Sequence, residues 1–226
     1  MQDDDKWIAA EAAVGEIVDG MAVGIGTGTT VAFAIAAIGR RIGEWPAVRF
    51  FATSQATVRA ARAVGIAIAS FADESRLDLA IDGVDEIDPA FRAIKGGGGA
   101  LLREKIVASA AQRMVAIADG SKRVAVLGKA PVPVEVLPFA RSFVAAEVER
   151  LGGEPTLRMG RDIAYRTNQG NLILDCRFAE LPDPERLAVA LQAIPGLLGH
   201  GLFLDQIDAA YVATDGIVTK LQRPAV

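Results

Sequence analysis

Short apolar runs alternate with stretches of helical periodicity over the first 128 residues. The apolar runs predict five strands: Ala22–Ile25, Val48–Ala52, Ile66–Ser70, Leu77–Ile81 and Met114–Ala118. The periodic stretches predict helices that begin near Lys6, Thr30, Gln55 and Ala100. This alternation is typical of βαβ units, so we predict an α/β fold with an open, mostly parallel, Rossmann-like sheet that has helices on both faces.

The pattern changes after residue 128, where prolines at positions 131, 133 and 138 flank an apolar strand. Further elements are expected along the next 70 residues: a helix Arg141–Leu151 that ends at two glycines, a hairpin turn Asn168–Asn171, a strand Leu172–Cys176, a helix Pro184–Ala193 and a strand Leu202–Leu204. This order of strands and helices predicts a smaller ferredoxin-like α+β subdomain.

The last apolar segments, Ala209–Ala213 and Ile217–Leu221, are assigned back to the first sheet. We therefore expect a catalytic α/β domain made of residues 1–128 and 207–226, and a smaller ferredoxin-like domain made of residues 129–206.

Composition narrows the classes of partner. A net charge of -4 and a pI near 5.2 argue against a nucleic-acid partner, because such proteins usually present a basic face. Cys176 is the single cysteine, which excludes an intramolecular disulfide and fits a reducing compartment. The acidic start Met1–Lys6 does not resemble a secretion signal, and the apolar run Val31–Ile38 is far shorter than the roughly 20 residues that span a bilayer. We expect a cytoplasmic protein without a nucleic-acid or membrane partner.

The first strand runs into a segment rich in glycine and threonine, Gly24–Thr30. Free amides and the helix dipole at such a helix start favour an anion, so Thr27, Gly28, Thr29 and Thr30 are candidate phosphate ligands. Thr29 stands where a dinucleotide fingerprint requires glycine, and the lysine of a P-loop is absent. An ordinary capped turn is the alternative interpretation.

The fourth predicted strand is followed by dense negative charge at Asp82, Asp85, Glu86 and Asp88. Like charges at close range disfavour joint ionisation, so this cluster requires a cation, a shared proton or hydrogen bonds to substrate hydroxyls. A magnesium site and a solvated acidic turn both remain open from the residues alone.

Two lysines follow strands or precede helices in the same half of the chain. Lys95 introduces the glycine run 96–99, which suits a close approach of backbone amides to a ligand, and Lys95 can meet a phosphate or a developing oxyanion. Lys122, in the segment Asp119–Lys122 after a strand, is a second candidate phosphate contact. A flexible loop and a surface lysine are the alternatives.

Glu104 lies in the helix after the glycine run, and its helical neighbours are apolar or small: Ala100, Leu101, Val107, Ala108 and Ala111. Partial burial raises the pKa of a carboxyl group toward neutrality, where a general base is useful. Glu104 is therefore a candidate base; an ion pair on the helix surface is the alternative interpretation.

Taken in order, several segments resemble the ribose-5-phosphate isomerase type A family: Gly26–Thr30, Asp82–Ile87, Lys95–Lys105, Asp119–Lys122, Leu127–Val136, Gly170–Asp175 and Gly201–Phe203. The resemblance implies an enzyme that interconverts D-ribose 5-phosphate and D-ribulose 5-phosphate. It implies that Glu104 moves a proton between C1 and C2 through an enediolate, with Lys95, Asp82 and Asp85 as the other catalytic groups. It further implies no metal, no organic cofactor, and a homo-oligomer, dimer or tetramer.

From these segments we expect the sugar phosphate to contact Thr27, Gly28, Thr29, Thr30, Asp82, Gly83, Val84, Asp85, Lys95, Gly96, Gly97, Gly98 and Lys122. The chain departs from the family at Thr29, where serine is common, and at Gln55, where an aspartate often occurs. His200 has no role that the family assigns, and we interpret it as structural.

Two other classes of protein compete with this interpretation. A sugar-phosphate hydrolase or amino-sugar isomerase would require a catalytic histidine, and His200 is the single histidine. A sugar-phosphate-sensing module of a transcription regulator would not need Glu104 and would carry a basic helix-turn-helix, which the sequence lacks.

Overall fold

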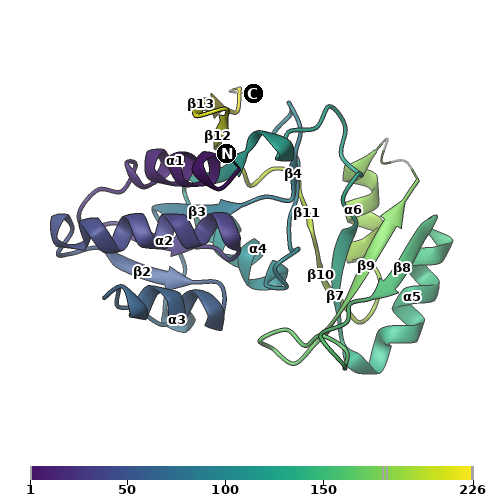
Figure 1. Cartoon of the computed structure of the whole chain (residues 1–226). Coiled ribbons are helices and arrows are strands. Elements are labelled where there is room, and N and C mark those ends of the chain that lie inside the picture. The colour runs from purple at the N-terminus through teal and green to yellow at the C-terminus, as the bar shows by residue number, and fades with distance from the viewer. Residues whose placement is uncertain (1, 180, 182, 225–226) are drawn as a thin grey trace.

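The computed structural model describes residues 2–179, 181 and 183–224, and its larger part is built on a six-stranded sheet (Figure 1). Across the sheet the strands are β13 (Ile217–Gln222), β12 (Ala209–Thr214), β6 (Met114–Asp119), β3 (Leu79–Gly83), β1 (Ala22–Ile25) and β2 (Arg49–Ala52). All neighbouring pairs are parallel except β12 and β13. The predicted mostly parallel α/β sheet, with the last two strands returned to it, is confirmed.

Helices cover both faces of this sheet. They are α1 (Gln2–Val14), α2 (Thr29–Arg41), α3 (Gln55–Ala63) and α4 (Leu101–Ala110). Because side chains alternate along a strand, Leu79 and Ile81 join the apolar core beneath α1 and α2, while Ala80 joins the core beneath α4. No helix in the described part of the chain is long and apolar enough to cross a bilayer.

The predicted strand Ile66–Ser70 is wrong. A single bridge joins Ile68 to Phe50 of β2, and the hydroxyl of Ser70 accepts a hydrogen bond from the Ala72 amide, which turns the chain into a short 3-10 helix. Local capping therefore ends the pairing that the apolar residues would otherwise support.

A second, four-stranded antiparallel sheet has the order β10 (Leu197–His200), β7 (Val132–Val136), β9 (Leu172–Phe178) and β8 (Gly153–Leu157). Helices α5 (Arg141–Arg150) and α6 (Pro184–Gln192) complete the βαββαβ order of a ferredoxin-like unit. The predicted turn lies within the 158–171 connection between β8 and β9, where Gly170 donates its amide to Thr167.

The predicted last strand of this unit, Leu202–Leu204, is wrong, because Leu197–His200 takes that place. Leu202–Phe203 forms β11 instead, in a small third sheet with β5 (Ala93–Ile94) and β4 (Glu86–Ile87). The change of sheet occurs at Gly201, whose amide donates to Pro133 and whose carbonyl accepts from the amide of Lys95. A Cβ at Gly201 would lie 2.3 Å from the Lys95 carbonyl oxygen, so this crossing requires glycine.

The expected division into residues 1–128 with 207–226 and residues 129–206 stays a prediction. Residues 1, 180, 182 and 225–226 of these ranges lie outside the described residues.

We expect the imidazole of the single histidine, His200, to stay neutral at acidic pH in the folded protein. His200 is buried, and its Nδ1 accepts the amide of Leu202 at 3.3 Å. Burial, assisted by the charge of Lys105, lowers the pKa of His200 from 6.5 to about 3. The folded state should therefore lose stability as pH falls below 6.5, because His200 binds a proton in the unfolded chain but stays neutral in the native chain.

Imidazole nuclear magnetic resonance signals test this directly, since one histidine gives one set of signals. The native protein should show a neutral ring at pH 5, whereas the urea-unfolded protein should titrate near 6.5. A charged ring in the native protein at pH 5.5 would contradict the assignment.

Candidate active site

The predicted site residues meet at the carboxyl edge of the main sheet, in a cavity of about 290 Å³. The cavity is lined by Thr27, Gly28, Thr29, Thr30, Gly83, Val84, Asp85, Lys95, Gly96, Gly97, Gly98, Glu104 and Lys122. Of the predicted catalytic and substrate-binding residues, Asp82 alone does not line the cavity. This volume lies near the lower end of ligand pockets, about 300–1,000 Å³, and suits a small metabolite.

Lys95 lies between two carboxylates beneath the cavity. Its Nζ is 2.8 Å from Asp82 Oδ2 and 3.4 Å from Glu104 Oε2, and all three side chains are at most 5% exposed. Burial alone would lower the pKa of Lys95, but the charges of Asp82 and Glu104 more than offset it and raise that pKa above its ordinary value. Lys95 is therefore a cation throughout the physiological pH range.

Asp82 accepts more hydrogen bonds than Glu104 does, although burial raises the pKa of Asp82 as well, against the opposing effect of Lys95 and the amides. Asp82 Oδ1 accepts the amides of Thr27 at 3.1 Å and of Gly83 at 2.7 Å, while its Oδ2 contacts Lys95. Glu104 Oε2 has no well-oriented hydrogen bond within the described part of the chain. Burial and the nearby charge of Asp82 raise the pKa of Glu104 to about 8, against the opposing effect of Lys95.

Asp82 is the last polar residue of β3 rather than a loop residue, and Gly26 makes room for it. Asp82 pairs with Ala116 in the sheet, so its side chain is fixed by strand geometry. A Cβ at Gly26 would lie 1.9 Å from Asp82 Cγ, which identifies the reason for glycine at that position. Asp82 thus does not line the cavity itself but contacts Lys95, which does.

The acidic cluster after β3 is divided among separate partners. Asp85 Oδ2 accepts the amide of Gly97 at 2.8 Å and faces the cavity. The other two carboxylates point elsewhere: Glu86 accepts the amides of Gly128 and Ala130, and Asp88 is paired with Arg92. Among the described residues, no group of three or more His, Cys, Asp or Glu side chains is arranged to hold a metal ion.

The start of α2 also lines the cavity. Gly28 has φ of 123°, a conformation suited to glycine, and no side chain caps the helix amides. Thr29 is exposed and Lys122, half-buried in the 3-10 helix Gly120–Lys122 after β6, lines the same region. An uncapped helix start beside a lysine is suited to a phosphate group.

Thr27 is more constrained than the sequence indicated. Its backbone amide donates a hydrogen bond to Asp82 Oδ1. Its Oγ1 lies within hydrogen-bond distance of three hydroxyl groups, those of Thr53 (2.8 Å), Ser54 (2.9 Å) and Thr57 (3.0 Å). Thr27 therefore fixes the turn, and the free donors for an anion are those of residues 28–30.

Gln55 lies outside this site. It lines a different cavity, next to α3, so its departure from the family pattern does not alter the candidate site.

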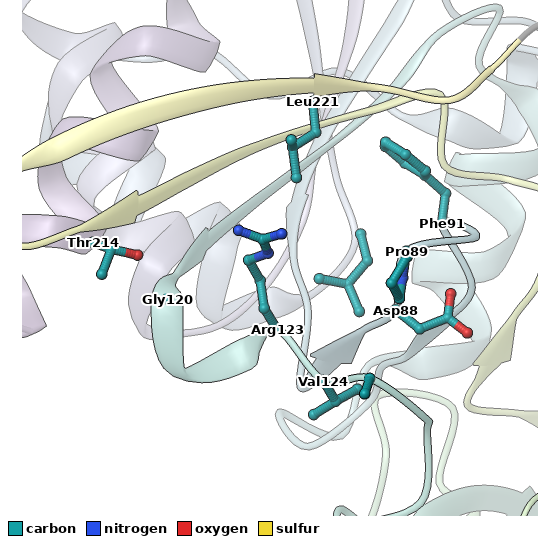
Figure 2. A pocket seen from close by; sticks show the side chains of 10 residues that line it. Asp88, Pro89, Phe91, Gly120, Arg123, Val124, Thr214 and Leu221 are labelled. Carbon is teal, nitrogen blue, oxygen red and sulfur yellow. The ribbon is translucent and has the colours of Figure 1, made fainter.

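A second cavity, of about 520 Å³, also lies outside the site, between β13 and the 3-10 turn after β6 (Figure 2). Its lining includes Phe91 and Leu221, and Figure 2 shows the side chain of Arg123 projecting into it. The one carboxylate there, Asp88, is occupied by Arg92, so we do not assign catalysis to this cavity.

Sequence reasoning missed side chains that support the site from the second and third sheets. The ring of Phe203 lies 5.2 Å from Lys95 Nζ and 4.7 Å from Lys105 Nζ. Arg158 donates to the carbonyl oxygens of Gly96 and Gly97. Tyr165 packs so closely on Gly99 that a Cβ there would lie 2.3 Å from the tyrosine hydroxyl. Nothing local in the sequence indicates these contacts, which join segments far apart in the chain.

The fold and the cavity are typical of an α/β enzyme of small anionic substrates, because a buried glutamate, a buried lysine and the uncapped start of a helix line one cavity. Comparison with known proteins gives the family. The family model described as ribose 5-phosphate isomerase A (phosphoriboisomerase A) matches residues 49–216. The chain belongs to the ribose 5-phosphate isomerase A family.

Individual relatives agree with this assignment along nearly the whole chain. Ribose-5-phosphate isomerase A of Sphingopyxis alaskensis is 50% identical over 219 residues, covering 97% of this chain and 96% of that protein. The crystal structure of ribose 5-phosphate isomerase A from Neisseria gonorrhoeae has a TM-score of 0.93 and 38% identity, covering 100% of this chain and 99% of that one. A D-ribose-5-phosphate isomerase in complex with phospho-erythronic acid has a TM-score of 0.95 and 36% identity, covering 99% of this chain and 100% of that one.

These comparisons confirm the resemblance, the fold class and the expectation of an isomerase.

Proposed function

We propose that this chain interconverts D-ribose 5-phosphate and D-ribulose 5-phosphate, with Glu104 as the base that moves a proton between C2 and C1. The observation that carries the proposal is the buried Glu104 carboxyl group, 3.4 Å from Lys95, in a cavity that ends at the uncapped start of α2. Phospho-erythronic acid, bound by a relative, supports it, because that ligand joins a phosphate to a carboxylate that resembles an enediolate in shape and charge.

The phosphate binds at the start of α2. The amides of Gly28, Thr29 and Thr30 donate to its oxygens, and Lys122 supplies a positive charge. This binding places the open-chain carbonyl end of the sugar beside Glu104, because the start of α2 and Glu104 line the same cavity. Holding the substrate at its unreactive end reduces the entropic barrier of the proton transfer.

The proton transfer uses a single base. Glu104 takes the proton from C2 of the aldose, so the C2–H electrons form the C1–C2 double bond of the enediolate and the π electrons of the C1 carbonyl move to O1. The same carboxyl group then returns the proton to C1, where the electrons of the C1–C2 double bond form the new C–H bond. O2 gives up its proton and forms the C2 carbonyl of the ketose. A pKa of about 8 makes Glu104 a stronger base than an ordinary carboxylate and still leaves an ionised fraction at neutral pH.

Lys95 and the amides of Gly96 and Gly98 stabilise the negative charge that develops on the enediolate oxygens, while the Gly97 amide holds Asp85. Asp85, which faces the cavity, exchanges protons with O1 and O2 and assists opening of the sugar ring. Asp82 fixes Lys95 and raises the pKa of Glu104. No metal and no organic cofactor enters these steps.

Three further properties belong to this proposal. We expect a cytoplasmic enzyme, a homo-oligomer that is a dimer or a tetramer, and a catalytic domain of residues 1–128 and 207–226 with a smaller domain of residues 129–206.

Replacing the base is the direct test. Glu104→Gln preserves size and removes basicity, so kcat for ribose 5-phosphate should fall about 10²–10⁴-fold. The measurement couples formation of the ketopentose to a colour or enzymatic assay, with EDTA present throughout.

Glu135 offers a matched control for Glu104. It is also a buried glutamate, but it lies in β7, where its Oε1 accepts hydrogen bonds from Thr167 and Asn171. Glu135→Gln should keep kcat near the wild-type value if it folds. Wild-type turnover by Glu104→Gln would refute the assignment of the base, and loss of wild-type activity in EDTA would refute the metal-free reaction.

The pH profile should report the raised pKa of Glu104. Because the base must be ionised, kcat/KM should rise with pH through about 8. Asp82→Asn removes a negative charge that raises this pKa, so the rise should move to lower pH in the residual activity.

Asp208 provides the control for that shift, because its carboxylate accepts the Met114 amide at the opposite edge of the sheet. Asp208→Asn should leave the midpoint unmoved. A midpoint for Asp82→Asn at or above that of the wild type would contradict the proposed coupling.

Lys122 and Arg123 are neighbouring cations that line different cavities. Lys122 lines the candidate site, and Arg123 lines the cavity of about 520 Å³. Lys122→Met removes a charge from the phosphate end and should lower kcat/KM about tenfold or more, mainly through KM, because a charge-assisted contact contributes about 1.5–3 kcal/mol. Arg123→Met alters the larger cavity and should leave both constants near wild type. Equal effects of the two substitutions on kcat/KM would contradict the assignment of Lys122 to the phosphate site.

A further inference from the structure

We propose that Arg158 is a positioning residue, which orients two peptide groups of the glycine run so that one N–H holds Asp85 and the next N–H faces the reacting end of the substrate. The inference rests on the proposed function and extends it to the second sheet, from which Arg158 comes.

Arg158 is itself firmly held. It follows β8, its side chain is 14% exposed, and it forms a two-point pair with Asp175 of β9, in which Nε lies 2.9 Å from Oδ2 and Nη2 contacts Oδ1. Its remaining nitrogen, Nη1, donates to the carbonyl oxygens of Gly96 at 2.9 Å and Gly97 at 3.1 Å. One planar guanidinium group therefore ties the glycine run to the second sheet.

The first peptide group links Arg158 to Asp85. The carbonyl of Gly96 and the amide of Gly97 belong to the same peptide group, which is trans, so its C=O and N–H point in opposite directions. Arg158 donates to that oxygen, and the Gly97 N–H donates to Asp85 Oδ2 at 2.8 Å. Each hydrogen bond polarises the peptide group in the sense that strengthens the other.

The second peptide group supplies a free donor. Its carbonyl belongs to Gly97 and is held by Arg158, so its N–H, which belongs to Gly98, points the opposite way. Gly97 and Gly98 line the cavity whereas Arg158 does not, so the N–H side faces the cavity. No acceptor for the Gly98 amide exists among residues 2–179, 181 and 183–224. This donor, polarised by a cation behind it, is suited to a developing enediolate oxygen.

Replacing Arg158 should weaken the stabilisation of negative charge at the carbonyl end of the substrate and leave phosphate binding largely unchanged. For Arg158→Met we expect kcat to fall about 10- to 100-fold with KM changed less than about threefold, because misplaced donors weaken the transition state more than the ground state. Arg158→Lys should recover little, because an ammonium group cannot hold Asp175 and both carbonyls together. Asp175→Asn, which keeps the arginine but loosens it, should give a smaller loss in the same direction.

Two ligands distinguish positioning from general damage. Binding of phospho-erythronic acid to Arg158→Met, measured by calorimetry, should weaken at least tenfold, while binding of inorganic phosphate at the start of α2 should stay within about twofold. Equal weakening of both ligands, or wild-type kcat in Arg158→Met, would overturn the proposal. Arg161→Met, an exposed arginine of the same 158–171 connection, is the control and should change neither ligand.

The ligand measurements also separate this inference from the proposed function. A wild-type protein that did not convert ribose 5-phosphate would refute the function. The difference between the two ligands would still decide whether Arg158 organises the glycine run.

Discussion

The site depends on one buried cation between two buried carboxylates. Lys95 contacts Asp82 and Glu104 together, and both carboxylates are almost completely buried. Asp82 accepts two backbone amides, whereas Glu104 Oε2 has no hydrogen-bond partner among the described residues. A glutamate with a raised pKa and a permanently charged lysine therefore arise from the same arrangement, through burial and the charges that the three groups exert on one another.

That arrangement is built by three sheets rather than one. The main sheet fixes Asp82 within β3, the small third sheet places Lys95 directly after β5, and Gly201 joins the second and third sheets by hydrogen bonds to Pro133 and Lys95. The second sheet adds Arg158 behind the glycine run. The glycine run 96–99 is consequently held in place by hydrogen bonds from neighbouring elements, which suits a loop that lines the cavity.

Much of the site followed from local sequence because each predicted residue comes directly after a strand or at a helix start, and the carboxyl ends of parallel strands meet at one edge. Glu104 was identifiable because its helical neighbours are apolar. The partners of the acidic segment were not predictable in the same way. Four carboxylates within seven residues suggested one cluster. In the structure Asp82 contacts Lys95, Glu86 accepts hydrogen bonds from backbone amides, and Asp88 pairs with Arg92. Residues of one short segment can face different directions, and side-chain spacing alone does not reveal which.

The sequence by itself determined the α/β class, the ferredoxin-like second unit, the glycine-rich turn before α2 and the buried glutamate of α4, because apolar periodicity, glycines and caps act over a few residues. The tertiary structure decided the end of pairing at Ile66–Ser70, the move of Leu202–Phe203 to a third sheet, the hydroxyl network around Thr27 and the contact of Arg158 with the glycine run. These features depend on contacts between segments far apart in the chain. Their hydrogen bonds and burial exist only once the sheets have assembled, so no local pattern records them.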